Sequence, residues 1–173
     1  QQETGVTTIF VTHDQEEAMS ISDLIIVMKD GIIQQIGKPQ AVYDDPVNLF
    51  VAQFLGTPAI NVLEGEIRHG RVRIGDEDVL DAGDRPDRKV WVGIRPEGFV
   101  LKEDGHFTCR LDRVEVMGRD VSVVSTHPKM SGRNMRSIIP AEDAAAAGKA
   151  REVRFDLRPS KVFLFDRESE ARV

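Results

Sequence analysis

Residues 151–157 read Arg-Glu-Val-Arg-Phe-Asp-Leu, with an apolar side chain at every second position from Val153 onward. A period of two is typical of a β-strand that turns one face to a core and the other to solvent. The same alternation recurs earlier in the chain, in the sets Val72 and Ile74; Val90, Val92 and Ile94; and Phe107, Cys109 and Leu111. The sequence after Asn61 therefore predicts a mainly β domain.

The apolar phase slips by one residue between Leu111 and Val114, which predicts a β-bulge near Asp112 and Arg113. Bulges allow short sheets to curl into barrels. Turn residues separate the expected strands, at Gly70, Gly75, Gly83, Gly105, Gly118 and Pro159. Many short strands at this spacing predict a small barrel or sandwich. The run Ala144–Ala147 is expected to form a single helical turn or a loop.

The first third of the chain has an α/β pattern instead. The continuous apolar runs Val6–Val11 and Leu24–Met28 are typical of strands buried on both faces, as in a parallel sheet. Asp30-Gly31 predicts a tight turn from the second run into a hairpin partner at residues 32–36. Between the runs, Thr12 or Asp14 is expected to cap a helix.

Two short helices are expected next. Pro39 suits the first position of a helix over Pro39–Tyr43. The second has one apolar face, ended by Gly56 and Pro58 and made of Val47, Phe50, Val51, Phe54 and Leu55. We place the domain boundary after this helix. The predicted organisation is an α/β unit over residues 1–57 and a β-rich domain over residues 58–173.

Charge changes at the same place. The chain has 173 residues and a net charge of −6, and the whole acidic excess lies in residues 1–60; residues 61–173 are neutral. A neutral β segment with few aromatic residues argues against nucleic-acid binding. No apolar run is long enough to span a membrane, and a single cysteine excludes an internal disulfide.

Two blocks carry a specific resemblance. Residues 7–37, TTIFVTHDQEEAMSISDLIIVMKDGIIQQIG, resemble the end of the nucleotide-binding domain of ABC importer ATPases, above all the sugar importer group that handles maltose and glycerol phosphate. Val92-Gly93-Ile94-Arg95-Pro96-Glu97 resembles the most recognisable strip of that group's C-terminal regulatory domain. The resemblance implies an oligonucleotide-fold-like (TOBE/MOP-like) barrel after an α/β remnant of the nucleotide-binding domain.

The resemblance also implies roles for individual residues. His13 corresponds to the switch-loop histidine, which contacts the γ-phosphate and helps to position the attacking water in the intact subunit. Its place at the end of an expected strand agrees with this role. Gly93, Arg95, Pro96 and Glu97 form the regulatory motif, in which Arg95 and Glu97 make either a contact between domains or a surface turn.

The phosphate-binding loop G-x-x-x-x-G-K-[ST], the magnesium-binding aspartate and the family's signature motif do not occur in these 173 residues. We therefore expect this part of the subunit to bind no nucleotide cofactor and to be inactive alone, with Mg-ATP belonging to the intact parent. The resemblance implies a homodimer, membrane subunits of an importer as partners, a regulatory protein or small effector on the β domain, and a cytoplasmic position at the membrane's inner face.

Other candidate sites are less convincing. Glu16 and Glu17 point about 100° apart on a helix, so they do not converge on one atom. The remaining histidines have no ligand-like spacing with Cys109, so no metal site is expected. Cys109 alternates with apolar neighbours and is interpreted as a core residue.

One alternative function stays open. The chain holds 16 arginines and 7 lysines, and related barrels in oxyanion importers hold small anions, so a free-standing anion-binding module is possible. We also expect the apolar strands of residues 5–55, which lack most of a sheet, to be partly disordered or covered by a second copy of the chain.

Overall fold

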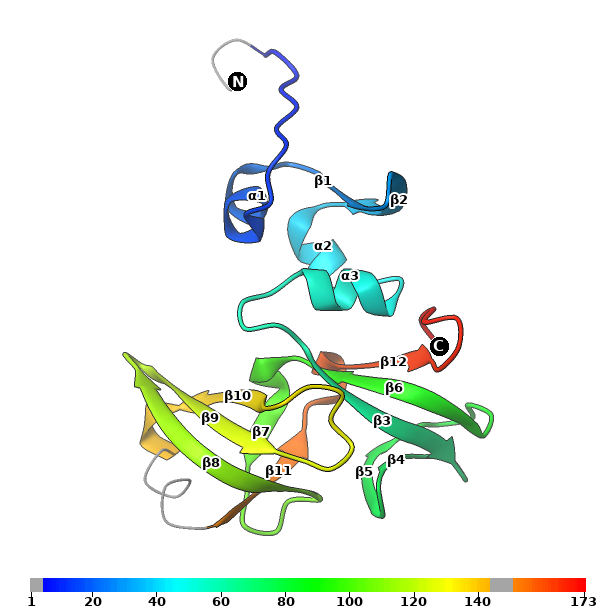
Figure 1. The fold of residues 1–173 in the computed structure, drawn as a ribbon, viewed down its shortest axis with the longest axis vertical. Coiled ribbons are helices and arrows are strands. Elements are labelled where there is room, and N and C mark those ends of the chain that lie inside the picture. The colour runs from blue at the N-terminus through cyan, green and yellow to red at the C-terminus, as the bar shows by residue number, and fades with distance from the viewer. Residues whose placement is uncertain (1–4, 144–150) are drawn as a thin grey trace.

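A stack of short helices and one hairpin lies on a β-barrel (Figure 1). The computed structural model describes residues 5–143 and 151–173, so the run Ala144–Ala147 lies outside the described residues. Two five-stranded antiparallel sheets form the barrel, with the strand orders β12-β6-β3-β4-β5 and β10-β9-β8-β11-β7. The mainly β barrel fold is confirmed, with an α/β segment before it.

The strands of the first sheet are β3 (Asn61–Arg68), β4 (Arg71–Ile74), β5 (Glu77–Asp81), β6 (Arg88–Ile94) and β12 (Val162–Asp166). The strands of the second sheet are β7 (Phe99–Leu101), β8 (Phe107–Met117), β9 (Asp120–Thr126), β10 (Met135–Pro140) and β11 (Glu152–Leu157). Short 3-10 turns connect them at η1 (Pro96–Gly98), η2 (Ala141–Asp143) and η3 (Pro159–Lys161).

The inner faces of both sheets share one apolar core. Phe99, Phe107 and Phe155 lie near its centre, with ring centroids 5.2 Å apart for Phe99–Phe155 and 6.4 Å apart for Phe99–Phe107. Cys109 is 1% exposed within this core, as predicted. The predicted bulge is also confirmed, because the register of β8 against β9 shifts between Leu111 and Arg113.

A buried asparagine helps to join the two sheets. Asn61 begins β3, and its side-chain amide donates to the carbonyl of Arg136 in β10 (2.9 Å) and accepts from the N–H of Arg136 (2.8 Å). The same amide nitrogen donates to the Ile94 carbonyl (3.1 Å). Because this is the pair of bonds that a neighbouring strand would form, the Asn61 side chain substitutes for a strand between the sheets.

The N-terminal elements are α1 (Gln15–Ile21), β1 (Ile25–Lys29), β2 (Ile32–Gly37), α2 (Pro39–Asp44) and α3 (Leu49–Phe54). Strands β1 and β2 form the predicted hairpin around Asp30 and Gly31. Strand β1 exists, but only Ile25 and Val27 are buried in it, so the prediction of burial on both faces was wrong. A two-stranded hairpin covered on one side buries only alternate residues.

No strand forms at Val6–Val11, which contradicts the prediction. Residues 5–12 have no regular secondary structure, and Ile9 and Val11 are 89% and 91% exposed. The apolar run has β-propensity, but none of the described segments offers it a neighbouring strand. An isolated strand leaves its backbone groups without partners, so propensity alone does not hold it in place.

Helix α3 is buried on two sides, whereas the sequence predicted one apolar face. Leu49 and Ala52 pack against Phe163 and Phe165 of the barrel. Val51 and Leu55 pack instead against the hairpin and α2. Val47 and Phe54, which the pattern placed in the core, are each 46% exposed. The helix is therefore a spacer between two apolar layers, and it tethers the hairpin to the barrel.

Candidate functional site

The motif at the end of β6 lies where the helices meet the barrel. Gly93 pairs with Phe163 on one side and with Val62 on the other. A Cβ at Gly93 would lie 2.9 Å from Ile60 Cδ1 and 3.1 Å from Phe165 Cε2, so only glycine fits this close approach. Pro96 then opens η1 and ends the strand.

We call the contact between the barrel and helices α2 and α3 the joint. Arg95 lies at its centre, and its side chain is fully buried. Its Nη1 donates to the carbonyls of Ala52 (2.9 Å) and Leu55 (2.5 Å), and its Nη2 donates to the carbonyl of Tyr43 (2.9 Å). These carbonyls lie at the C-terminal ends of α3 and α2, where helices leave acceptors without intrahelical partners. One guanidinium therefore caps two helices at once.

Aromatic rings complete the surroundings of this cation. The guanidinium carbon lies 3.8 Å from the ring centroid of Tyr43 and 5.7 Å from that of Phe163, both favourable for cation–π attraction. Burial lowers the pKa of Arg95, while the negative groups near it act in the opposite direction. Arginine retains its charge even so, because its pKa starts above about 12.

A polar network surrounds the joint. The Tyr43 hydroxyl donates to Glu97 (3.0 Å), and burial raises the pKa of Tyr43 to about 12. The Lys161 ammonium in η3 lies 2.9 Å from Asp44 and 3.5 Å from Glu97. Glu97 and Lys161 belong to the barrel, and Tyr43 and Asp44 to α2. The motif therefore makes a contact between the two parts of the chain and is not a surface turn.

The C-terminal residues form a second connection, which we call the C-terminal strap (residues 170–173). The Leu49 N–H donates to the Glu170 carbonyl (2.9 Å), and the Arg172 N–H donates to the Val47 carbonyl (3.0 Å). The strap also bonds to β12, through Val173 N–H and the Leu164 carbonyl (3.0 Å). Arg172 lies over the ring of Phe163 at 4.6 Å, on which Arg95 also acts.

His13 lies outside this joint. It is an exposed residue just before α1, where Asp14 caps the helix by accepting from the N–H groups of Glu16 (3.0 Å) and Glu17 (3.1 Å). Asp14 is thus the cap, as one of the two predicted choices. Gln15, the next residue, reaches the joint instead, since its Oε1 accepts from the Gly56 N–H (2.6 Å).

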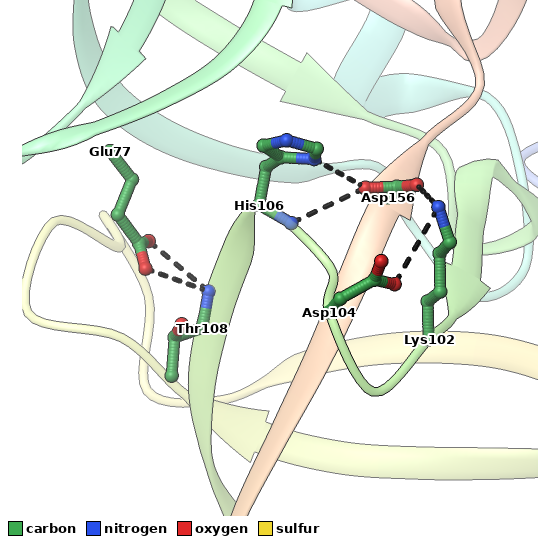
Figure 2. Close-up of polar contacts among 6 residues, drawn as sticks. All are labelled: Glu77, Lys102, Asp104, His106, Thr108 and Asp156. Carbon is green, nitrogen blue, oxygen red and sulfur yellow. Dashed lines mark hydrogen bonds and ion pairs between the residues drawn. The ribbon is translucent and has the colours of Figure 1, made fainter.

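A second polar region lies on the barrel (Figure 2). Glu77 of β5 accepts from the backbone N–H of Thr108 in β8 through both carboxylate oxygens, at 3.2 and 3.1 Å. Strand β9, which neighbours β8 on that side, ends at Thr126, so the carboxylate satisfies a strand N–H that no backbone carbonyl reaches. This contact links the two sheets.

The same region holds a histidine–aspartate pair. His106 Nδ1 lies 2.8 Å from Asp156, and the Lys102 ammonium lies 2.9 Å from the other oxygen of that carboxylate (Figure 2). The hydrogen bonds from His106 and Lys102 lower the pKa of Asp156 to about 2. The pair pins the turn at residues 102–106 to β11. Within residues 5–143 and 151–173, no three histidine, cysteine or acidic side chains gather as metal ligands.

Sequence reasoning missed several parts of the joint: Tyr43, Gln15, Lys161 and the strap. An available signal was Arg95 itself, a charged residue directly after the apolar run of β6 and before a proline. The sequence gives no signal for the strap, because its hydrogen bonds use backbone groups that nearly every residue has.

None of the helices among the described residues is long and apolar enough to cross a membrane.

Comparison with known proteins gives consistent matches over the whole chain. The sn-glycerol-3-phosphate import ATP-binding protein UgpC of Ruegeria sp. (strain TM1040) is 34% identical over 173 residues, which cover 100% of this chain and 48% of that protein. The diacetylchitobiose uptake system ATP-binding protein MsiK of Streptomyces coelicolor is 34% identical over 196 residues, covering 100% and 52%. The sulfoquinovosyl glycerol transport ATP-binding protein SmoE of Agrobacterium fabrum is 35% identical over 182 residues, covering 99% and 49%.

The chain thus spans about half the length of these relatives. No protein-family model matches the chain.

Proposed function

Because this chain is homologous over its full length to the C-terminal half of ABC importer ATP-binding subunits, we propose that it is the regulatory end of such a subunit, serving the import of sugars or sugar phosphates. The observation that carries the proposal is the joint at Arg95. A barrel residue that caps two helices of the proposed ATP-binding part gives a direct route by which a change in one part can reach the other.

Within the intact subunit, His13 would act on the γ-phosphate of bound Mg-ATP, and the residues Gly93–Glu97 would hold the barrel against the ATP-binding domain. The chemistry of phosphoryl transfer needs positioned groups around the phosphates. The 173 residues contain no phosphate-binding loop, so the expected behaviour of this chain alone is to bind no Mg-ATP. The proposed partners are importer membrane subunits, a second copy of the subunit and an effector of the barrel, at the cytoplasmic membrane face.

The alternative of a free anion-binding barrel has less support. Several arginines on the barrel are engaged by carboxylates: Arg71 with Asp81 at 3.5 Å, Arg73 with Asp78 at 2.9 Å, Arg136 with Glu115 at 2.7 Å and Arg167 with Glu64 at 2.6 Å. Arginines already bonded to carboxylates are poor candidates for holding a free anion, because the anion would have to displace a partner of the same charge.

A chimera tests the proposed function. The chain would replace the matching half of the glycerol-phosphate import ATP-binding protein, and ATP hydrolysis and import would be measured with that protein's own membrane subunits. We expect the chimera to hydrolyse Mg-ATP and to support import, and the separate 173-residue chain to show no Mg-ATP binding by calorimetry.

His13→Ala in the chimera should abolish hydrolysis, whereas His69→Ala, which changes an exposed histidine of the barrel, should leave it intact. A folded chimera without hydrolysis, or hydrolysis that survives His13→Ala, would contradict the proposal.

A further inference from the structure

Helix α1 is held to the rest of the chain by few contacts. None of its residues is fully buried, and only Ala18 and Met19 pack partly against the cluster of the hairpin and α2. A hollow of about 270 Å³ lies beside the helix, lined by residues of α1 and α2 and by Gly56 and Thr57. A helix attached in this way has space to shift and little buried area to resist the movement.

One polar contact fixes its end. Gln15, in the first turn of α1, accepts at Oε1 from the Gly56 N–H at 2.6 Å. Gly56 follows the C-cap residue of α3, Leu55. This side-chain hydrogen bond therefore ties α1 to the end of α3, and it begins two residues after His13.

Gly56 is in turn enclosed by the joint. Its φ is +111°, and a Cβ there would lie 2.9 Å from Tyr43 Cε2 and 3.2 Å from Arg95 Nη1. Arg95 Nη1 holds the carbonyl of Leu55, the residue just before Gly56. The peptide that joins Leu55 to Gly56 is thus bonded by Arg95 at its carbonyl and by Gln15 at its N–H.

We infer that Gln15 is a positioning residue that couples helix α1, and with it His13, to the barrel through this peptide group. A shift of β6 that moved Arg95 would tilt the Leu55–Gly56 peptide, and the tilt would pull on Gln15. By thermodynamic reciprocity, a movement of α1 would act on Arg95 to the same extent. The meaning of the coupling for ATP hydrolysis rests on the proposed function, whereas the coupling itself is a property of this chain.

Hydrogen exchange and NMR on the full 173-residue chain test the inference. Gln15→Ala should speed exchange at the Gly56 amide and along α1 by about fivefold, the net worth of one hydrogen bond of about 1 kcal/mol. The same variant should shift the side-chain Nε–H resonance of Arg95, with which Gln15 forms no hydrogen bond in the described structure. Gln15→Glu, which keeps an acceptor oxygen at the same reach, should restore slow exchange at the Gly56 amide. Glu16→Ala, a change of the neighbouring exposed residue, should alter neither.

The reverse direction supplies the second measurement. Arg95→Lys should speed exchange in α1, which meets Arg95 at the Leu55–Gly56 peptide and also packs near Tyr43 of α2, the residue whose carbonyl Arg95 binds. Unchanged Arg95 resonances in Gln15→Ala would overturn the coupling, as would fast exchange of the Gly56 amide in Gln15→Glu. The Gln15 variants alter a half-buried residue outside the core, so their outcome is readable even if Arg95→Lys unfolds. Failure here would leave the chimera result untouched, and a failed chimera would leave this coupling standing.

Discussion

Arg95 binds Tyr43 in two ways at once: its guanidinium lies 3.8 Å from the centroid of the tyrosine ring and donates to the carbonyl of the same residue at 2.9 Å. The two residues are 52 positions apart, one at the end of β6 and one in α2. Among residues 5–143 and 151–173 no carboxylate is bonded to this buried cation; helix-end carbonyls and ring faces stabilise its charge instead. The contact is therefore sensitive to the shape of the cation as well as to its charge.

This geometry makes Arg95→Lys a severe change. Lysine keeps the positive charge, but a single ammonium does not span carbonyls on both helices or stack on a ring as a planar guanidinium does. We expect a loss of about 2–4 kcal/mol in unfolding free energy, since hydrogen bonds to charged groups contribute roughly 1.5–3 kcal/mol each. Urea denaturation followed by Trp91 fluorescence measures it. Arg158→Lys, at an exposed position, serves as the control and should change stability by less than about 0.5 kcal/mol.

Gly56→Ala should destabilise the chain more than Gly31→Ala. Both glycines have positive φ, +111° at Gly56 and +78° at Gly31. A Cβ at Gly31 meets nothing within 4 Å, so that substitution costs only the backbone penalty of about 1–2 kcal/mol. At Gly56 the Cβ would press on Tyr43 and Arg95 as well. Equal losses in the two variants, measured by thermal unfolding, would mean that the joint relaxes freely around Gly56.

Asn61→Ala should weaken the contact between the two sheets, the seam at which the Asn61 side chain bonds to Arg136 and Ile94. The substitution removes the amide that donates to two buried carbonyls and accepts from one N–H. Each buried backbone group left unsatisfied costs about 1–3 kcal/mol, so we expect a loss of roughly 3 kcal/mol or more. Hydrogen exchange should rise first at Arg136, whose N–H loses its acceptor. Ser131→Ala removes a single hydroxyl bond to the Val62 carbonyl at the same seam and should cost much less.

Acid should weaken the turn at residues 102–106 in a defined pH range. The pKa of Asp156 is lowered to about 2 in the folded chain, from an ordinary value of 3.8. A lowered carboxyl pKa contributes stability that is complete above the ordinary value and is lost as pH falls toward 2. Asp156→Asn should therefore flatten the dependence of the urea midpoint on pH between about 4 and 2, because its proton uptake is removed.

Much of the barrel could be predicted from the sequence. The alternation of apolar residues placed the strands, and the phase slip at Leu111–Val114 predicted the bulge near Asp112 and Arg113, where the register shifts. These signals are local, because the alternation of apolar and polar residues within a strand shows which of its faces is buried. The cap at Asp14 and the hairpin at Asp30–Gly31 are local in the same sense.

The failures concern partners distant in sequence. Val6–Val11 has the composition of a strand, but a strand also requires a neighbour, and none of the described residues supplies one. The apolar face of α3 was misplaced because the helix packs on two layers, which a single-stripe pattern does not describe. The sequence singled out Arg95, but the groups that it binds are backbone carbonyls. Every residue type has such a carbonyl, so the sequence does not show which residues Arg95 binds.

The C-terminal strap has a consequence for how the chain assembles during synthesis. Helix α3 receives bonds from Arg95 and from the strap, and β6 pairs with β12, so its surroundings draw on residues 43 through 173. The ribosome delivers the helix before the strap. The side of α3 that faces the barrel, with Leu49 and Ala52, is therefore uncovered until more than a hundred later residues have emerged, whereas its other side can pack at once against the hairpin and α2. This interval is when chaperone binding would protect the nascent chain.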